Sequence, residues 1–133
     1  MPDMTQSIEL FLRHFGVGLC LTIVFVAAYA AVTPQKEFKL IREGNAAAAL
    51  GVGGATLGFV IPLSLVLSIT ANLVEASAWG AVSLLVQLLG LLLTRVIVPS
   101  LAQDISDGKI SAAVVQAVAG VCLGLLQAAS WVP

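Results

Sequence analysis

The sequence predicts an all-α integral membrane protein with four transmembrane helices, built as two parallel repeats of a two-helix unit. Apolar residues make up 59% of the 133 residues and charged residues only 10%. The mean hydropathy is +1.06, far from the composition of soluble domains. Four apolar stretches are each long enough to cross ~30 Å of hydrocarbon at ~1.5 Å per residue. A short motif also recurs in the second half of the chain, which indicates a duplication.

The expected spans run from 11 to 33, from 46 to 72, from 76 to 98 and from 110 to 132. They leave too little sequence for a soluble domain, so we expect a single membrane domain over 1–133. Repeat one would cover about 8–72 and repeat two about 75–132. The first span contains Ala28-Tyr29-Ala30, which resembles a signal-peptidase site. The segment before it is not basic and the third span is its counterpart, so we expect the first span to be retained.

The repeat motif is an acidic residue, a glycine and a polar residue, placed between an apolar span and a helix rich in small residues. Each glycine is expected to end the preceding helix or turn. In the first copy the asparagine side chain is a favourable N-cap for the second span. In the second copy a lysine stands there, so Asp107, Ser111 or water must serve instead. The two copies are Glu43-Gly44-Asn45 and Asp107-Gly108-Lys109.

Small residues at helical spacing mark the faces through which the second and fourth spans are expected to pack. In lipid, helices associate by close packing and interhelical hydrogen bonds, because burying apolar surface gains nothing there. Such faces are more numerous than four helices require, which favours a homo-oligomer. The predicted helix-packing residues are Ala47, Gly51, Gly54 and Gly58 in the second span, and Gly120 and Gly124 in the fourth, where Gln116 and Gln127 extend the stripe.

The third span carries a polar stripe that has two interpretations. It is either a packing seam, with serine and glutamine bonded to neighbouring helices, or a polar path for conduction or binding. Gln87 is expected near mid-membrane, where its side chain has several groups to satisfy. The stripe consists of Gly80, Ser83, Gln87, Gly90 and Thr94.

Two further residues stand out within the spans. Pro62 lies inside the second span, where it removes one backbone hydrogen bond and is expected to kink the helix. Arg95 lies four residues before Pro99, close enough to the end of its span for the side chain to reach the interface. It is therefore an interfacial anchor or a gating residue paired with Asp104 or Glu43.

Cations indicate the orientation in the membrane. Five lie in or beside the two longer connections, and the N-terminal segment contributes only Arg13. This distribution places both longer connections in the cytoplasm and both termini outside. The five cations are Lys36, Lys39, Arg42, Arg95 and Lys109.

The sequence shows no chemistry typical of an enzyme. There is one histidine, and no nucleophile elbow, phosphate-binding glycine loop or metal-ligand spacing is found. We therefore expect no catalytic, cofactor-binding or metal-binding residues. With a net charge of −1 and no basic block, nucleic acid is not an expected partner.

The stretch Arg42-Glu43-Gly44-Asn45-Ala46-Ala47-Ala48-Ala49, followed by Gly54-Ala55-Thr56-Leu57-Gly58-Phe59, resembles the YjfL-like bacterial inner-membrane proteins. The ending Leu123-Gly124-Leu125-Leu126-Gln127-Ala128-Ala129-Ser130 is similar to the last helix of that family. The resemblance implies two repeats of two spans and a bacterial inner membrane, but no activity. Lys109 departs from the Gly-Asn that family members often have in the second copy.

Two functions remain open from the sequence. One is a homo-oligomeric scaffold or accessory subunit of an envelope system, which would contact the lipid bilayer, copies of itself and other membrane proteins. The alternative is a small channel or transporter component with a polar path along the third span. A conduction path requires Ser83, Gln87 and Thr94 to line a hydrated cavity, whereas a scaffold requires them to be buried and dry.

Overall fold

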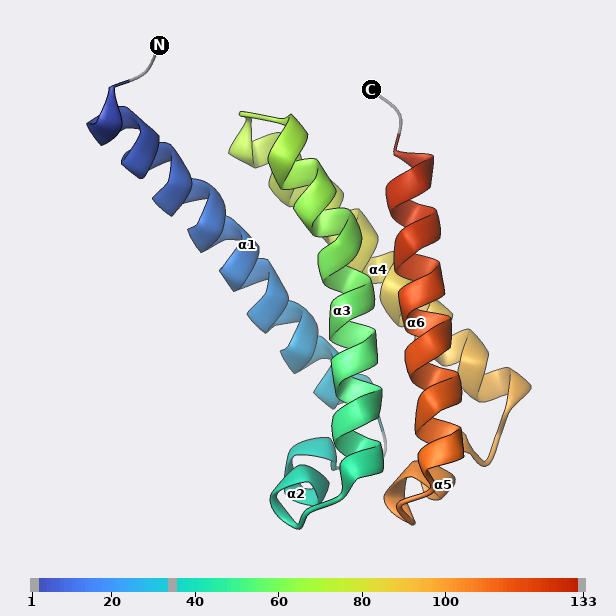
Figure 1. The fold of residues 1–133 in the computed structure, drawn as a ribbon. Coiled ribbons are helices and arrows are strands. Elements are labelled where there is room, and N and C mark those ends of the chain that lie inside the picture. The colour runs from blue at the N-terminus through green and yellow to red at the C-terminus, as the bar shows by residue number, and fades with distance from the viewer. Residues whose placement is uncertain (1–2, 34–35, 132–133) are drawn as a thin grey trace.

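A computed structural model of the chain describes residues 3–33 and 36–131, and these contain six helices and no strand. Four of the helices are long and apolar enough to cross a membrane, which confirms the all-α class and the four predicted spans. In each half of the chain, one short helix lies between the two long helices (Figure 1). The helices are α1 (Met4–Val32), α2 (Glu37–Arg42), α3 (Ala46–Ile69), α4 (Leu73–Ile97), α5 (Leu101–Ser106) and α6 (Ile110–Ser130).

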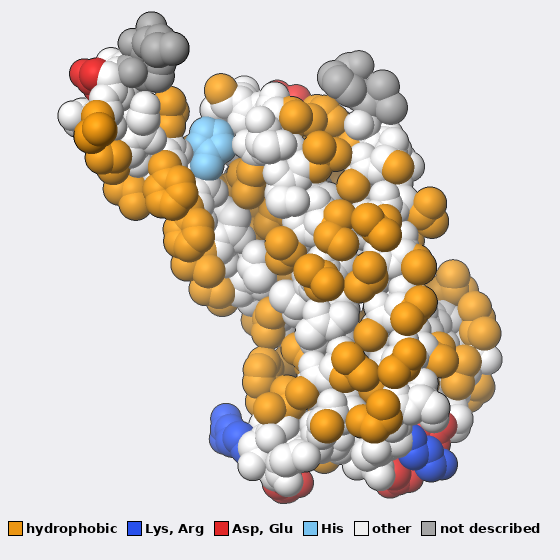
Figure 2. All heavy atoms as spheres, in the orientation of Figure 1, with side chains coloured by type: hydrophobic (Ala, Val, Ile, Leu, Met, Phe, Trp, Pro, Cys, Tyr) orange, Lys and Arg blue, Asp and Glu red, His pale blue; other side chains and the backbone are white. Residues whose placement is uncertain are grey.

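The order of elements is the same in both halves: a long helix, a six-residue helix and a second long helix. The start of α1 and the end of α6 lie at one end of the bundle, and α2 and α5 lie at the other (Figure 1). In Figure 2, apolar side chains cover most of the visible face between the ends, and Lys and Arg gather at the α2 and α5 end. This distribution suits a protein that spans a bilayer.

Helix α1 begins seven residues earlier than expected because its first turn is capped. The Asp3 side chain accepts a hydrogen bond from the backbone N–H of Gln6 at 2.8 Å, and the Gln6 side chain accepts one from the N–H of Asp3 at 3.4 Å. This reciprocal capping box satisfies two N–H groups that the helix itself leaves free.

The third span was expected to begin at residue 76, which is wrong, because α4 begins at Leu73. The side chain of Asn72 accepts from the N–H groups of Val74 and Glu75, at 3.0 and 3.2 Å. Asn72 is therefore an N-cap, and only Thr70 to Asn72 separate α3 from α4.

Both glycines of the repeat motif end their short helix as predicted. Gly44 and Gly108 have φ angles of +86° and +82°, a conformation that favours glycine. The N–H of Gly44 donates to the Ile41 carbonyl at 3.0 Å, and that of Asn45 donates to the Leu40 carbonyl at 2.9 Å. The pair of bonds defines a Schellman motif, and the same pair recurs around Gly108.

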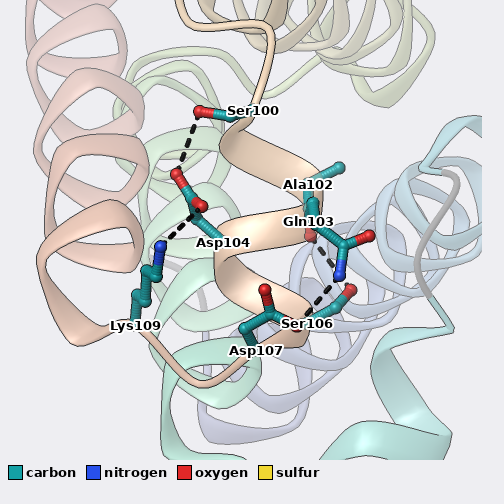
Figure 3. A network of polar contacts seen from close by, with 7 residues as sticks. All are labelled: Ser100, Ala102, Gln103, Asp104, Ser106, Asp107 and Lys109. Carbon is teal, nitrogen blue, oxygen red and sulfur yellow. Dashed lines mark hydrogen bonds and ion pairs between the residues drawn. The ribbon is translucent and has the colours of Figure 1, made fainter.

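The second copy of the motif differs in its side chains (Figure 3). Lys109 makes no side-chain cap bond to α6; its ammonium instead donates to Asp104 at 3.2 Å, and Ser100 donates to the same carboxylate at 3.0 Å. The hydrogen bond from Ser100, and then that from Lys109, lower the pKa of Asp104.

The centre of the bundle is the close contact between α3 and α6. A Cβ atom added to Gly54 would lie 2.4 Å from the Cα of Ala117, and one added to Gly124 would lie 2.0 Å from the Gly58 carbonyl oxygen. Because glycine has no side chain, the backbones of α3 and α6 can touch at these positions. Beside this contact, the rings of Phe25 of α1 and Phe59 of α3 stack with centroids 4.7 Å apart.

Pro62 lies buried within α3, which continues on both sides of it. Proline has no N–H to donate to the carbonyl four residues earlier, which is that of Gly58. This carbonyl points towards the backbone of Gly124. The carbonyl left without its helical partner therefore lies at the closest approach of α3 to α6.

Candidate functional site

Six polar side chains lie inside the bundle as three hydrogen-bonded pairs, and we call them the interior polar network. They come from α1, α2, α4 and α6 and from the segment that joins α1 to α2. Five of them are buried, and the sixth, Gln127, is partly buried. The network consists of Tyr29, Thr33, Glu37, Gln87, Gln116 and Gln127.

Gln87 lies at the centre of the network and is only 3% exposed. Its Nε2 donates to the carbonyl oxygens of Ala55 on α3 at 3.4 Å and of Gly120 on α6 at 3.1 Å. Its Oε1 accepts from Nε2 of Gln127 at 3.0 Å. One side chain of α4 is thus bonded to two other spanning helices, and its amide hydrogens and carbonyl all have partners.

Glycines make room for this amide. A Cβ atom on Gly58 would lie 2.4 Å from Nε2 of Gln87, so even an alanine would displace the glutamine. Gly58 therefore both brings α3 against α6 and leaves space for the polar group between them.

Gln116 and Tyr29 form the next part of the network, closer to α2. The side-chain amide of Gln116 on α6 donates to the hydroxyl of Tyr29 on α1, and both residues are 2% exposed. Gly51 on α3 provides the space, since a Cβ there would lie 2.9 Å from Nε2 of Gln116.

Glu37 ends the network at the α2 end of the bundle. It is 2% exposed, and its Oε2 lies 2.6 Å from the hydroxyl oxygen of Thr33. The Tyr29 hydroxyl is near enough to the Glu37 carboxyl to affect its titration. Burial raises the pKa of Glu37, and the Thr33 hydroxyl and the positive charge of Arg95 oppose this rise.

The Arg95 side chain is less exposed to solvent than is expected of an anchor at the membrane interface. The residue is partly buried, and its Nε and Nη2 atoms are withdrawn from solvent. Its charge acts on Glu37, a carboxyl that the sequence analysis did not consider as its partner. Of the two predicted partners, Asp104 accepts from Ser100 and Lys109, and Glu43 is exposed.

Two hollows adjoin the network. A small cavity, with about 20 Å³ of space for the centre of a water molecule, lies between Gln116 and Gln87 and is also lined by Thr94. This is room for about one water. At the end of the bundle opposite α2, a more open pocket of about 430 Å³ is lined by Gln127, Ser83 and other residues of α4 and α6.

The predicted stripe on α4 therefore faces the inside of one bundle. Gly80, Ser83 and Gln87 are buried, and Gly90 and Thr94 are partly buried. Gly80 packs against Leu21 and Leu63, and Gly90 packs against Leu123. Thr94 donates to the carbonyl of its own helix at Gly90.

Sequence analysis missed three members of the network, which are Tyr29, Thr33 and Glu37. Tyr29 was considered only within a possible cleavage site, and Glu37 stands among cations that were used to assign the orientation. The three residues are four positions apart along the chain, but α1 ends at Val32 and α2 begins at Glu37, so they do not share one helical face. No regular spacing in the sequence identifies all three.

Within the described residues, no group of three or more His, Cys, Asp or Glu side chains is placed to hold a metal ion. Glu37 is the described carboxyl that is buried, so the chemistry available in the interior is hydrogen bonding and the binding of a single proton. The geometry offers donors, acceptors and one acid rather than a catalytic pair.

Four spanning helices, with polar groups joined inside them, define a small multi-pass helical membrane protein. Residues 3–131 match the family described as Domain of Unknown Function (DUF350), and the chain belongs to this family. It is also similar to "UPF0719 inner membrane protein YjfL" of Escherichia coli strain K12, with 32% identity over 124 residues that cover 93% of this chain and 94% of that protein. The protein of the same name from Escherichia coli O157:H7 gives the same values. No solved structure matches significantly.

These matches confirm the resemblance drawn from 42–49 and from the last helix. They support an inner-membrane protein whose activity is not defined by its family.

Proposed function

We propose that the chain is a small channel or transporter component whose path runs through the interior polar network of a single bundle. The observation that carries the proposal is the extent of this network. It begins at Glu37 beside α2 and passes Tyr29 and Gln116 to Gln87 and Gln127, which lines the open pocket at the other end. Polar groups are thus spaced from one end of the interior to the other, with the small cavity between Gln116 and Gln87.

Polar side chains inside a membrane protein are costly and usually functional. Close packing of α3 against α6 needs only the glycines, and an apolar residue at position 87 would require no partners. Instead, Gln87 is held by bonds to Ala55, Gly120 and Gln127. A role in moving a polar species explains why such a group is placed at the centre.

On this proposal the path is closed in the form described above. The cavity beside Gln87 holds about one water, and the stacked rings of Phe25 and Phe59 lie next to it. Passage therefore needs a change in how α1 and α4 pack on α3 and α6. Figure 1 shows α1 diverging from α3 towards its N-terminal end, so this helix is the element we expect to move.

The orientation is part of the proposal. Five cations lie at or beside the α2 and α5 end, so the positive-inside rule places this end in the cytoplasm and both termini outside. Labelling a single cysteine at position 39 from the outside of intact spheroplasts should fail, and a cysteine at position 3 should be labelled. Equal labelling of both positions would contradict the orientation.

One argument for the scaffold hypothesis no longer applies. It relied on small-residue faces beyond the needs of one chain, whereas Gly51, Gly54, Gly58 and Gly124 all face other helices of the same chain. Assembly into a homo-oligomer, and contact with other membrane proteins, stay predictions that need a separate observation.

Flux through purified protein in vesicles tests the path. We expect vesicles with the natural chain to pass protons or small ions under an applied gradient, and Gln87→Leu to abolish this flux. The matched control is Gln103→Leu, because Gln103 is an exposed glutamine of α5 that bonds only to Asp107. Absence of flux in the natural chain, or equal flux in both variants, would remove the proposal.

A further inference from the structure

Glu37 is a buried acid in a segment whose other charged residues are exposed. Its neighbours Lys36 and Lys39 are exposed, whereas Glu37 is 2% exposed. A buried carboxyl is stable only when it is paired and hydrogen bonded or when it is neutral. Its surroundings show which of these applies.

The hydrogen bonds around Glu37 fit the neutral acid. The hydroxyl oxygen of Thr33 lies 2.6 Å from Oε2 of Glu37 and 2.9 Å from the carbonyl oxygen of Tyr29. A hydroxyl has one hydrogen, so the Thr33 hydroxyl makes a full hydrogen bond either to Oε2, as it does when Glu37 is ionised, or to the Tyr29 carbonyl, which also accepts from the backbone N–H of Thr33 at 3.1 Å. A proton on Oε2 satisfies both contacts, because Glu37 then donates to Thr33 and Thr33 donates to Tyr29.

The second carboxyl oxygen points to the same state. Among the described residues, Oε1 of Glu37 is buried and accepts no hydrogen bond, although the Tyr29 hydroxyl is close to the carboxyl. Leaving one oxygen of an ionised carboxylate unpaired in the interior costs more than leaving the carbonyl of a neutral acid unpaired. The geometry therefore favours the protonated side chain.

The second half of the chain shows that the fold does not need an acid here. Glu37 is the first residue of α2 and precedes Gly44 by seven positions, and Leu101 has the same relation to α5 and Gly108. Leu101 is 1% exposed. An apolar side chain thus fills the corresponding buried position, so the acid in the first half is not explained by packing.

The charged and titratable groups that act on Glu37 come from two helices. Tyr29 of α1 is close to the carboxyl, and the positive charge of Arg95 on α4 favours its ionised form. Helix α3, which packs against α2, carries no titratable side chain. Glu37 is thus held between burial, which favours the neutral acid, and Arg95, which favours the carboxylate.

We infer that Glu37 is a proton-binding site at the α2 end of the interior polar network. Uptake adds one proton to the carboxylate and forms the O–H that donates to Thr33, and release returns the proton to water at the α2 end. The transported species of the proposed path would then be the proton. This last step rests on the proposed function, whereas the protonation of Glu37 does not.

Infrared spectroscopy of the folded chain in lipid nanodiscs tests the site directly. We expect a protonated-carboxyl band that persists above the pH of about 4 at which exposed carboxyls ionise, and that disappears as the pH rises further. The band should be absent in Glu37→Gln and retained in Glu43→Gln, which alters an exposed acid of the same segment. Glu37→Leu, which copies Leu101, serves as a folded reference without an acid.

Arg95→Gln provides a second test. Removing the cation that favours the carboxylate should raise the pH at which the band is lost. A midpoint that stays the same or falls would contradict the inferred balance between burial and Arg95.

The outcomes separate this inference from the proposed function. A band that depends on Glu37 in a protein without flux would uphold the proton site and remove the path. Flux that depends on Gln87, without a carboxyl that stays protonated at a higher pH than the exposed acids do, would uphold the path and overturn the site. The site is likewise overturned if Glu37→Gln leaves the band unchanged.

Discussion

Replacement of Gly124 by alanine should strongly destabilise the bundle. The new Cβ atom would lie 2.0 Å from the carbonyl oxygen of Gly58 and 2.8 Å from its Cα. Even a weak carbon–oxygen contact needs ~3.3 Å, so α3 and α6 would have to separate by ~1.3 Å at this point. Both atoms that clash on Gly58 belong to the backbone, and no side-chain rotation relieves them.

The size of the effect follows from two opposing contributions. Overpacking that moves backbone costs ~1–3 kcal/mol, and we expect the upper end here. Alanine recovers up to ~1 kcal/mol because it is the better helix former. The free energy of unfolding should therefore fall by ~2 kcal/mol for Gly124→Ala.

A graded series of glycines provides the controls. Gly53, which has no atom within 4 Å of an added Cβ, should tolerate alanine or gain up to ~1 kcal/mol. Gly120, where the nearest atom would be at 3.3 Å, should fall between Gly53 and Gly124.

Unfolding by sodium dodecyl sulfate in mixed micelles measures these differences. Tryptophan fluorescence is a suitable signal, because Trp79 and Trp131 contact each other edge to face with centroids 5.9 Å apart. Equal midpoints for the alanine variants of Gly53 and Gly124 would refute the reasoning. So would a midpoint for Gly120→Ala below that of Gly124→Ala.

Two further predictions concern Glu37 and Asn45. Burial raises the pKa of Glu37, so the folded chain binds this proton more tightly than the unfolded chain does. Stability should be greatest below the ordinary glutamate pKa and should fall as the pH rises through the raised value; thermal melts of Glu37→Gln should lack this fall. Asn45→Ala should cost ~1–2 kcal/mol in the unfolding assay, because it removes the cap on the N–H of Ala48 and the bonds from Asn45 to the carbonyls of Ile105 and Ser106 in the other half. Lys109→Ala, which removes no cap from α6, should cost less, and the reverse order would contradict the assigned capping roles.

The fold could be predicted from sequence because each of its main constraints is local. Hydropathy and length are enough to identify four spans, and Gly44 and Gly108 mark the ends of the short helices because their position needs a positive φ. The boundaries of α1 and α4 were less accurate. They depend on the capping side chains of Asp3 and Asn72, which extend the helices beyond the apolar stretches.

The site was harder to predict because its members come from different helices. A polar stripe in the sequence identifies one face of a helix, but it does not identify the groups of other helices that pack against that face. Gln87 was identified as a residue with groups to satisfy, whereas its partners at Ala55 and Gly120 are backbone carbonyls, which leave no trace in the sequence. Glu37 was missed because a charged residue between two cations is normally solvated.

The two interpretations of the polar stripe, packing seam and polar path, do not exclude each other in this bundle. Gly58 allows α3 to approach α6, and the same missing side chain leaves the space that the Gln87 amide occupies. The carbonyl of Gly120, exposed by this close approach, becomes an acceptor for Gln87. Glycines that only packed the helices would leave a dry backbone contact, and glutamines without them would not fit. Close packing is therefore the condition under which polar groups can be placed in the interior, and a substitution at Gly58 should disturb both the stability of the bundle and any flux through it.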